Sequence, residues 1–116
     1  MLNKVGVYLY IPKEHSLQLI VAGDHRKKGA SQEQFQDCPI MLIFVANYNK
    51  MANFPDESKE LYSGTDTGNI SQNVYLYCAS EGLATCALGS IHREELKKLL
   101  NFNGKAILGQ SVGNAK

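Results

Sequence analysis

The 116-residue sequence has no tryptophan, no long apolar run and almost no imbalance of charge. Its longest apolar run, residues 40–46, is far shorter than the roughly 20 residues of a membrane-spanning helix, so we expect no membrane partner. The 12 basic and 11 acidic residues leave a formal net charge of +1, which creates no long-range field that attracts nucleic acid. The one basic cluster, residues 25–28, is short and contains no aromatic residue, which is typical of a solvated turn.

Cysteine is scarce. Cys38, Cys78 and Cys86 form neither a CxxC pair nor a zinc-ligand spacing with histidine, so we expect no metal site. Cys38 and Cys78 lie inside apolar patterns, where a free cysteine acts as a small hydrophobe. Reduced thiols, and an N-terminus without the pattern of a secretory signal, predict a cytoplasmic protein.

Familiar catalytic and nucleotide-binding motifs are also lacking. Gly82 and Gly89 belong to neither a GxGxxG fingerprint nor a P-loop, which disfavours a dinucleotide-binding unit. His15, His25 and His92 fall on two loops and a helix start, and isolated histidines of this kind indicate surface or capping roles. The residues alone therefore identify no catalytic group.

Strand patterns are clear in several segments. Alternation over residues 5–11 and 17–21 predicts an antiparallel hairpin. The continuous apolar run over residues 39–46 predicts a central strand covered on both faces. We expect a short extended segment over residues 87–91 and a final strand over residues 105–112.

Helix signals occupy the intervening segments. Ser31 can cap a short helix through Asp37, and residues 92–101 carry the charge order that suits a helix dipole. The most informative helix is expected from Gly68 to Gly82, with Asp66 or Thr67 as its cap and Gly82 as its left-handed end.

This helix is apolar on two sides. One stripe contains Ile70, Val74, Tyr77 and Cys78, and the other contains Leu76, Ala79 and Leu83 with Tyr75 beside them. A helix with two apolar stripes needs two partners, namely its own sheet and something else. The element order predicts a single α+β domain over residues 1–116, in which a mixed, largely antiparallel sheet is packed by the central helix and a second, shorter helix.

One segment has a possible ligand meaning. Between Thr85 and Ile91, glycine and serine offer little steric bulk, so backbone N–H groups can approach a flat heterocycle closely. The alternative is a plain edge strand between two helices, and the residues alone favour that alternative.

Several motifs in order resemble the nitroreductase family. They are Val7-Tyr8-Leu9-Tyr10, Gly23-Asp24-His25-Arg26, Gln34-Phe35, Cys38-Pro39, the run from Asp66 to Leu76, Glu81-Gly82-Leu83, Gly89-x-Ile91, Glu95-Leu96-x-x-Leu99-Leu100 and Gln110-x-Val112-Gly113. The chain is most similar to the C-terminal half of the short, SagB-like bacterial branch of that family. The likeness covers nearly all 116 residues.

The resemblance implies a flavoprotein that is a homodimer with FMN at its interface and uses NAD(P)H to reduce nitro compounds or quinones. The helix from Gly68 to Gly82 matches the family's central helix, which packs against its symmetry mate. Residues Ala87, Leu88, Gly89 and Ser90 match the segment that lies along the isoalloxazine ring. There, backbone N–H groups stabilise charge on the reduced flavin.

The chain also departs from the family pattern. The family's N-terminal half, with its opening helices and its arginine cradle for the FMN phosphate, has no counterpart, so the domain is expected to be truncated on that side. Gly113-Asn114-Ala115 replaces the usual Gly-Tyr-Pro, and Lys116 is the only basic candidate beyond it. Two hypotheses follow. Either flavin binds weakly or with help from a partner chain that supplies the missing half, or the chain is a non-catalytic dimeric remnant that binds no flavin.

Overall fold

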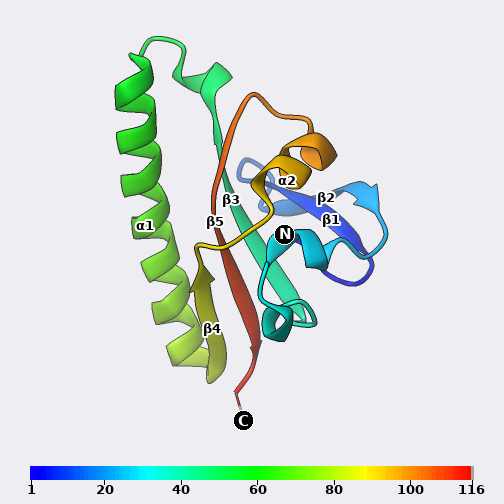
Figure 1. Cartoon of the computed structure of the whole chain (residues 1–116). Helices are drawn as coiled ribbons and strands as arrows, with labels where there is room; N and C mark the ends of the chain where they lie inside the picture. The colour runs from blue at the N-terminus through cyan, green and yellow to red at the C-terminus, as the bar shows by residue number, and fades with distance from the viewer. Residues whose placement is uncertain (116) are drawn as a thin grey trace.

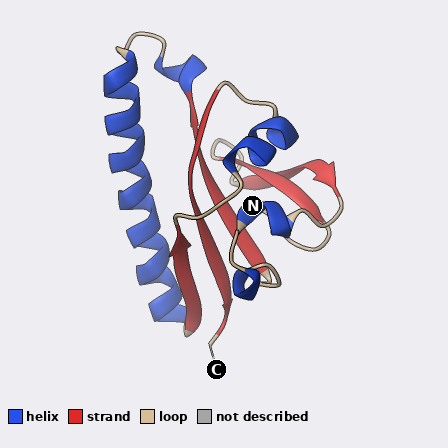
Figure 2. Ribbon diagram, viewed as in Figure 1, coloured by secondary structure: helices blue, strands red, loops and turns tan. Residues whose placement is uncertain are grey.

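The computed structural model describes residues 1–115. Helices pack on both sides of a three-stranded sheet, and two further strands form a separate hairpin (Figures 1 and 2). The helix α1 stands against one side of that sheet, whereas α2 and the hairpin lie on the other side. In chain order the elements are β1 (Gly6–Ile11), β2 (Ser16–Ala22), η1 (Arg26–Gly29), η2 (Glu33–Phe35), β3 (Ile40–Asn47), η3 (Tyr48–Met51), α1 (Asp56–Glu81), β4 (Leu83–Leu88), α2 (Arg93–Leu100) and β5 (Gly104–Asn114).

The strands β1 and β2 form the predicted antiparallel hairpin. Its turn includes His15 at φ 47°, a left-handed conformation that is uncommon outside glycine. Leu2 joins the hairpin to the larger sheet, because it forms isolated bridges with both Val7 and Met41. The predicted α+β class with antiparallel pairing is confirmed.

The larger sheet has the order β3-β5-β4, with both pairings antiparallel. The central strand is therefore β5, and the prediction that residues 39–46 form the central strand is wrong. The expected covering of both faces is also incomplete, because Ile40 and Leu42 line an open hollow and Val45 is exposed. A continuous apolar run does not report how many strands flank a strand. Among the pairings of the described residues, the outer edge of β3 has only the isolated bridge to Leu2.

Three element boundaries also differ from the prediction. The helix α1 begins at Asp56, so Asp66 and Thr67 lie inside it and cap nothing. Pro55 precedes this start, and the acidic Asp56 and Glu57 suit the helix dipole. The strand β4 occupies Leu83–Leu88 rather than residues 87–91. The short helix expected over residues 31–37 is only the 3₁₀ turn η2.

Other predicted ends are confirmed. Gly82 adopts φ 70° and its N–H donates to the carbonyl oxygen of Cys78, which ends α1 as expected. The predicted helix over residues 92–101 is α2, with His92 and Asn101 at its two caps.

The apolar core lies between the sheet and the α2 side. Its buried members are Leu2, Val7, Ala30, Met41, Leu88, Ile91, Leu96 and Ala106. Arg93, the first residue of α2, donates to the carbonyl oxygens of Ala106 and Ile107 at 3.0 and 2.9 Å. Those carbonyls lie at the irregularity of the β3–β5 ladder, so α2 is fixed to the sheet by both apolar and polar contacts.

The other side of the sheet meets a different kind of surface. The buried residues of α1 are Ser63, Thr67, Ser71 and Cys78. The predicted apolar stripes are therefore not the main contact: Ile70, Leu76 and Tyr77 are at least half exposed, and Leu83 belongs to β4. Small side chains let the helix approach the sheet closely and leave its larger apolar residues in the open.

Candidate functional site

The segment Ala87–Ser90 contains the last two residues of β4 and the first two of the loop that leads to α2. This loop, drawn in yellow in Figure 1, passes over β5 partway along the sheet. At the start of the segment, the Ala87 N–H donates to the Tyr75 hydroxyl at 2.7 Å. Tyr75 belongs to α1, so this bond ties the segment to the long helix. The sequence pattern places Tyr75 beside an apolar stripe and gives no sign of this hydroxyl contact, because no pattern indicates which polar atom a half-buried tyrosine reaches.

The far end of the segment is also held. The Ser31 N–H donates to the Ser90 carbonyl oxygen at 3.0 Å, and the His92 N–H donates to the Lys28 carbonyl oxygen at 3.2 Å. Leu88 is buried and pairs with Gly109 in the ladder of β4 and β5. The segment is thus fixed on both sides of Gly89.

The middle of the segment offers backbone donors. Gly89 and Ser90 are exposed, and the hydrogen bonds of the described residues give their N–H groups no protein acceptor. A Cβ added to Gly89 would meet no atom within 4 Å, so there is open space beside its backbone. Two neighbouring N–H groups at an open surface suit an acceptor edge of a flat ligand.

A buried polar network holds α1 beside this segment. The Ser71 hydroxyl donates to Gln110 Oε1 at 2.8 Å, and Gln110 Nε2 donates to the Thr85 hydroxyl at 3.0 Å. Gln110 is fully buried, and its two polar atoms are both satisfied. Ser71 precedes Tyr75 by one helical turn, so the network fixes the part of α1 that carries the Tyr75 bond.

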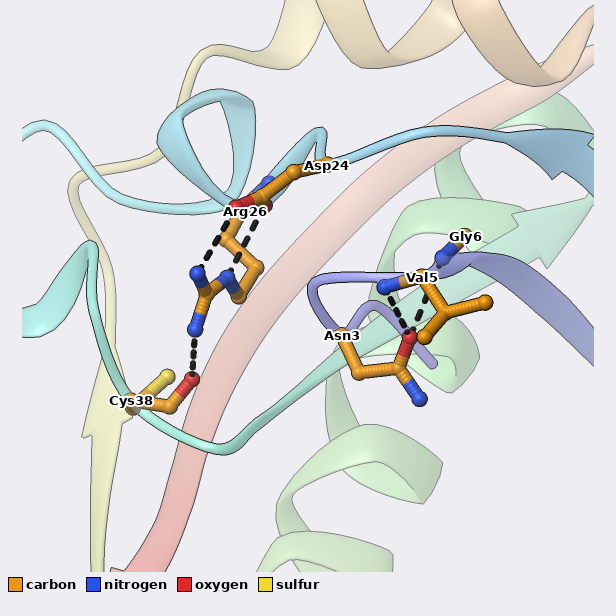
Figure 3. Close-up of polar contacts among 6 residues, drawn as sticks. All are labelled: Asn3, Val5, Gly6, Asp24, Arg26 and Cys38. Carbon is orange, nitrogen blue, oxygen red and sulfur yellow. Dashed lines mark hydrogen bonds and ion pairs between the residues drawn. The ribbon is translucent and has the colours of Figure 1, made fainter.

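The sequence predicts a solvated turn for the basic cluster over residues 25–28, but the structure shows a cluster that is engaged with protein oxygens. Arg26 Nε and Nη2 donate to the two carboxylate oxygens of Asp24, and Nη1 donates to the Cys38 carbonyl oxygen at 2.9 Å (Figure 3). The same view shows the Asn3 side chain accepting from the N–H groups of Val5 and Gly6. The Arg26 side chain is only 14% exposed. Its hydrogen bonds to Asp24 lower the pKa of that carboxyl group from 3.8 to about 2.

These contacts decide which kind of ligand group the described residues can hold. The open donors of Gly89 and Ser90 fit a ring edge, whereas both arginines, Arg26 and Arg93, are engaged with protein oxygens. Neither arginine is available as a phosphate ligand without losing these bonds. The other basic candidate, Lys116, lies outside the described residues.

An open groove runs between α1 and β3. It consists of two hollows of about 600 and 360 Å³, and Ile70 lines both. Ile40 and Leu42 of β3 face Val74 and Tyr77 of α1 across the smaller hollow, whose other lining residues are Met1, Ile70, Asn73, Cys78 and Val112. The sheet face beside α1 therefore keeps an uncovered apolar strip.

The histidines are dispersed, as expected. His15 Nδ1 lies 2.9 Å from the Tyr10 hydroxyl, and His25 Nε2 lies 3.1 Å from the Ala22 carbonyl oxygen. Within residues 1–115 no three His, Cys, Asp or Glu side chains gather in a way that could hold a metal ion. The three cysteines are free. None of the helices in these residues is both long and apolar enough to cross a membrane.

Comparison with known proteins gives consistent results. The family model described as Nitroreductase matches residues 7–114. A protein of Methanocaldococcus jannaschii whose name assigns it to the nitroreductases is 32% identical over 112 residues, which are 93% of this chain and 57% of that protein.

Solved structures agree. The crystal structure of a protein from Ralstonia eutropha JMP134, also assigned to the nitroreductases, has a TM-score of 0.89 and 34% identity, and the match covers 99% of this chain and 56% of that one. The Escherichia coli microcin synthetase McbBCD complex shares the fold, with a TM-score of 0.81 and 16% identity over 97% of this chain and 46% of that one. The chain thus spans a little over half the length of the relatives that it matches above 30% identity. It belongs to the nitroreductase family.

Proposed function

We propose that this member of the nitroreductase family is an FMN-dependent oxidoreductase in which the edge of the isoalloxazine ring lies against Ala87, Leu88, Gly89 and Ser90. The observation that carries the proposal is the pair of open N–H groups at Gly89 and Ser90, on a segment that is fixed at both ends. A fixed donor needs no rearrangement to stabilise charge that develops on a ligand, which is the condition for effective electrostatic catalysis.

When bound, FMN supplies hydride transfer from NAD(P)H to an acceptor such as a nitro compound or a quinone. The chain's own residues bind and orient the ring. The N–H groups of Gly89 and Ser90 donate to its polar edge and favour the state with more negative charge there. The absence of a side chain at Gly89 allows the backbone to approach the ring.

The proposal includes a homodimer through the part of α1 from Gly68 to Gly82. Ile70 and Leu76 lie in this part of the helix, on two different sides of it, and are 50% and 59% exposed. Large apolar side chains exposed on a helix can be covered by a partner. The proposal also includes a partner chain that contributes further contacts to the flavin.

A second candidate is a dimeric remnant of the fold that binds no flavin. The engagement of Arg26 and Arg93 with protein oxygens favours it, since charge-assisted bonds to phosphate are among the strongest contacts a flavin phosphate makes. Losing several such bonds, at about 1.5–3 kcal/mol each, weakens affinity by several orders of magnitude.

The visible spectrum of the purified protein distinguishes the candidates. We expect flavin bands that survive desalting after incubation with FMN. In Gly89→Val the bands should be lost while the melting temperature is unchanged, because the added side chain enters open space and occupies the place of the ring. Gly64→Val adds the same side chain in open space on α1 and should keep the bands. A wild-type protein that stays colourless with added FMN supports the remnant instead.

A further inference from the structure

Two side chains bond to the backbone of Ala87–Ser90 among the hydrogen bonds of the described residues. The Tyr75 hydroxyl accepts from the Ala87 N–H at 2.7 Å, and the thiol of the adjacent Cys86 donates to the Ala87 carbonyl oxygen at 3.5 Å. The Ala87 N–H lies two residues before the open donor of Gly89. Because Tyr75 accepts this hydrogen, the N–H points away from β5 and toward α1. The end of β4 is therefore held from the helix side at Ala87, in addition to the pairing of Leu88 with Gly109 in the ladder.

The helix that carries Tyr75 is well placed for this role. One turn earlier, Ser71 is buried and bonded to the fully buried Gln110 of β5. Tyr75 itself is half buried. Because the helix is bonded to the neighbouring strand, the Tyr75 hydroxyl has a defined position and restricts the position of the Ala87 N–H.

Tyr77 provides a contrast within the same helix. It lies two residues further along, is 62% exposed, and its hydroxyl has no hydrogen bond among those of the described residues. The two tyrosines therefore differ in the contact to Ala87, which makes them a matched pair for experiment.

We propose that Tyr75 is a positioning residue for the ligand-facing segment: through the Ala87 N–H it fixes the direction in which Gly89 and Ser90 present their own N–H groups. The role in ligand binding rests on the proposed function, whereas the control of the segment's geometry does not. Tyr75 acts through Ala87 and needs no contact with the ligand.

Amide resonances and hydrogen exchange of the protein without flavin test the geometric part. In Tyr75→Phe we expect the amide resonances of Ala87, Gly89 and Ser90 to shift, and the Ala87 N–H to exchange about tenfold faster, because it has lost its acceptor. In Tyr77→Phe these amides should be unchanged. Unchanged Gly89 and Ser90 amides in Tyr75→Phe overturn the proposal, whatever happens with flavin.

Titration with FMN tests the consequence for binding. Tyr75→Phe should raise the dissociation constant for FMN about tenfold, whereas Tyr77→Phe should leave it within twofold of the wild-type value. If the wild-type protein binds no FMN, the proposed function fails, and the amide measurements alone decide the positioning role.

Ala87→Pro tests the positioning role independently and remains informative if Tyr75→Phe folds poorly. It removes the same bond from the other side, and proline is tolerated where the N–H of an edge strand points away from the ladder. Tyr75→Phe should then have no additional effect on Gly89, Ser90 or FMN affinity in the Ala87→Pro background. An equal effect of Tyr75→Phe in both backgrounds would show that Tyr75 acts by another route and would refute the proposal.

Discussion

The two sides of the β3-β5-β4 sheet are held by different physical means. On the α2 side, eight buried apolar residues form a continuous core. On the α1 side, the buried helix residues are Ser63, Thr67, Ser71 and Cys78, and the helix is tied to the strands through Gln110 and Tyr75. Burial of apolar area is strong and non-directional, whereas hydrogen bonds contribute less free energy but fix orientation.

This difference matches the division of roles proposed for the two sides. The α2 side supplies most of the stability. The α1 side places a helix in a defined position beside Ala87–Ser90 and leaves an apolar groove next to β3 uncovered. A helix attached in this way keeps its larger apolar residues available for a partner.

The largest effect is expected from Leu96→Ala. Leu96 is fully buried in the core, so the variant loses its transfer free energy and leaves a cavity, at about 2–5 kcal/mol in the free energy of unfolding. Urea denaturation measures this loss. Leu61→Ala on α1, where the side chain is 66% exposed, should change stability by less than about 0.5 kcal/mol. Equal losses in the two variants would contradict the assignment of the core to the α2 side.

A smaller effect is expected from Gln110→Met, which keeps the length of the side chain but removes its three hydrogen bonds, two with Ser71 and one with Thr85. We expect a loss of about 1–2 kcal/mol, because the Ser71 and Thr85 hydroxyls lose a buried partner. Combined with Ser71→Ala in a double-mutant cycle, the coupling should be about 1 kcal/mol. A variant as stable as the wild type, with no coupling, would mean that α1 is not held by this network.

The third prediction concerns pH and the Asp24–Arg26 pair. The Asp24 pKa is lowered from 3.8 to about 2, so the pair contributes fully above about pH 4, and its contribution is lost as the pH falls through 2. The Asp24 side chain is 44% exposed, so Asp24→Asn should cost less than about 1 kcal/mol at neutral pH. The difference from the wild type should vanish toward pH 2 in acid denaturation followed by circular dichroism.

Asp56→Asn is the matched control for that prediction. Asp56 pairs with Lys59 at 3.1 Å, but its side chain is 98% exposed, so its removal should change stability by only a few tenths of a kcal/mol. A gap between the wild type and Asp24→Asn that stays constant from pH 5 to pH 2 would contradict a role for the Asp24 carboxylate.

The smallest effect on folding is expected from Leu76→Asp, which tests association instead. Leu76 is 59% exposed, so the charge stays in water and the stability of the protomer should change by less than about 0.5 kcal/mol. The molar mass in solution, measured by light scattering at micromolar concentration, should fall from dimer to monomer. Leu17→Asp makes the same change at a 48% exposed site on the hairpin and should leave the mass unchanged. A monomeric wild type, or a dimer broken by Leu17→Asp instead, would contradict association through α1.

Local patterns predicted the elements that local chemistry controls. Alternation gave the hairpin, and Gly82 gave the end of α1, because a left-handed residue is accessible to glycine at little cost. The start of α1 was wrong, because Asp66 and Thr67 have the preferences of a cap wherever they stand, and a helix that already began at Asp56 simply continues through them.

The candidate site was predicted only in part. The small residues around Gly89 and the resemblance to a family pointed to the segment Ala87–Ser90, and the ligand assignment there stays a prediction. The bonds that hold the segment, from Tyr75, Ser31 and Lys28, join positions between 12 and 64 residues apart in the chain and so carry no local signal. A glutamine inside the apolar strand pattern at Gln110 was the available sign of a buried polar contact.

The sequence by itself determined the order of most elements, the family resemblance and the presence of more apolar surface on the Gly68–Gly82 helix than a sheet contact requires. Only the tertiary structure decided which face of α1 meets the sheet. It is the face of small and polar side chains, because these satisfy the buried Gln110 of β5, whereas Ile70, Leu76 and Tyr77 remain exposed. Periodicity reports how much apolar surface a helix has, but the neighbour that covers each face depends on contacts distant in the chain.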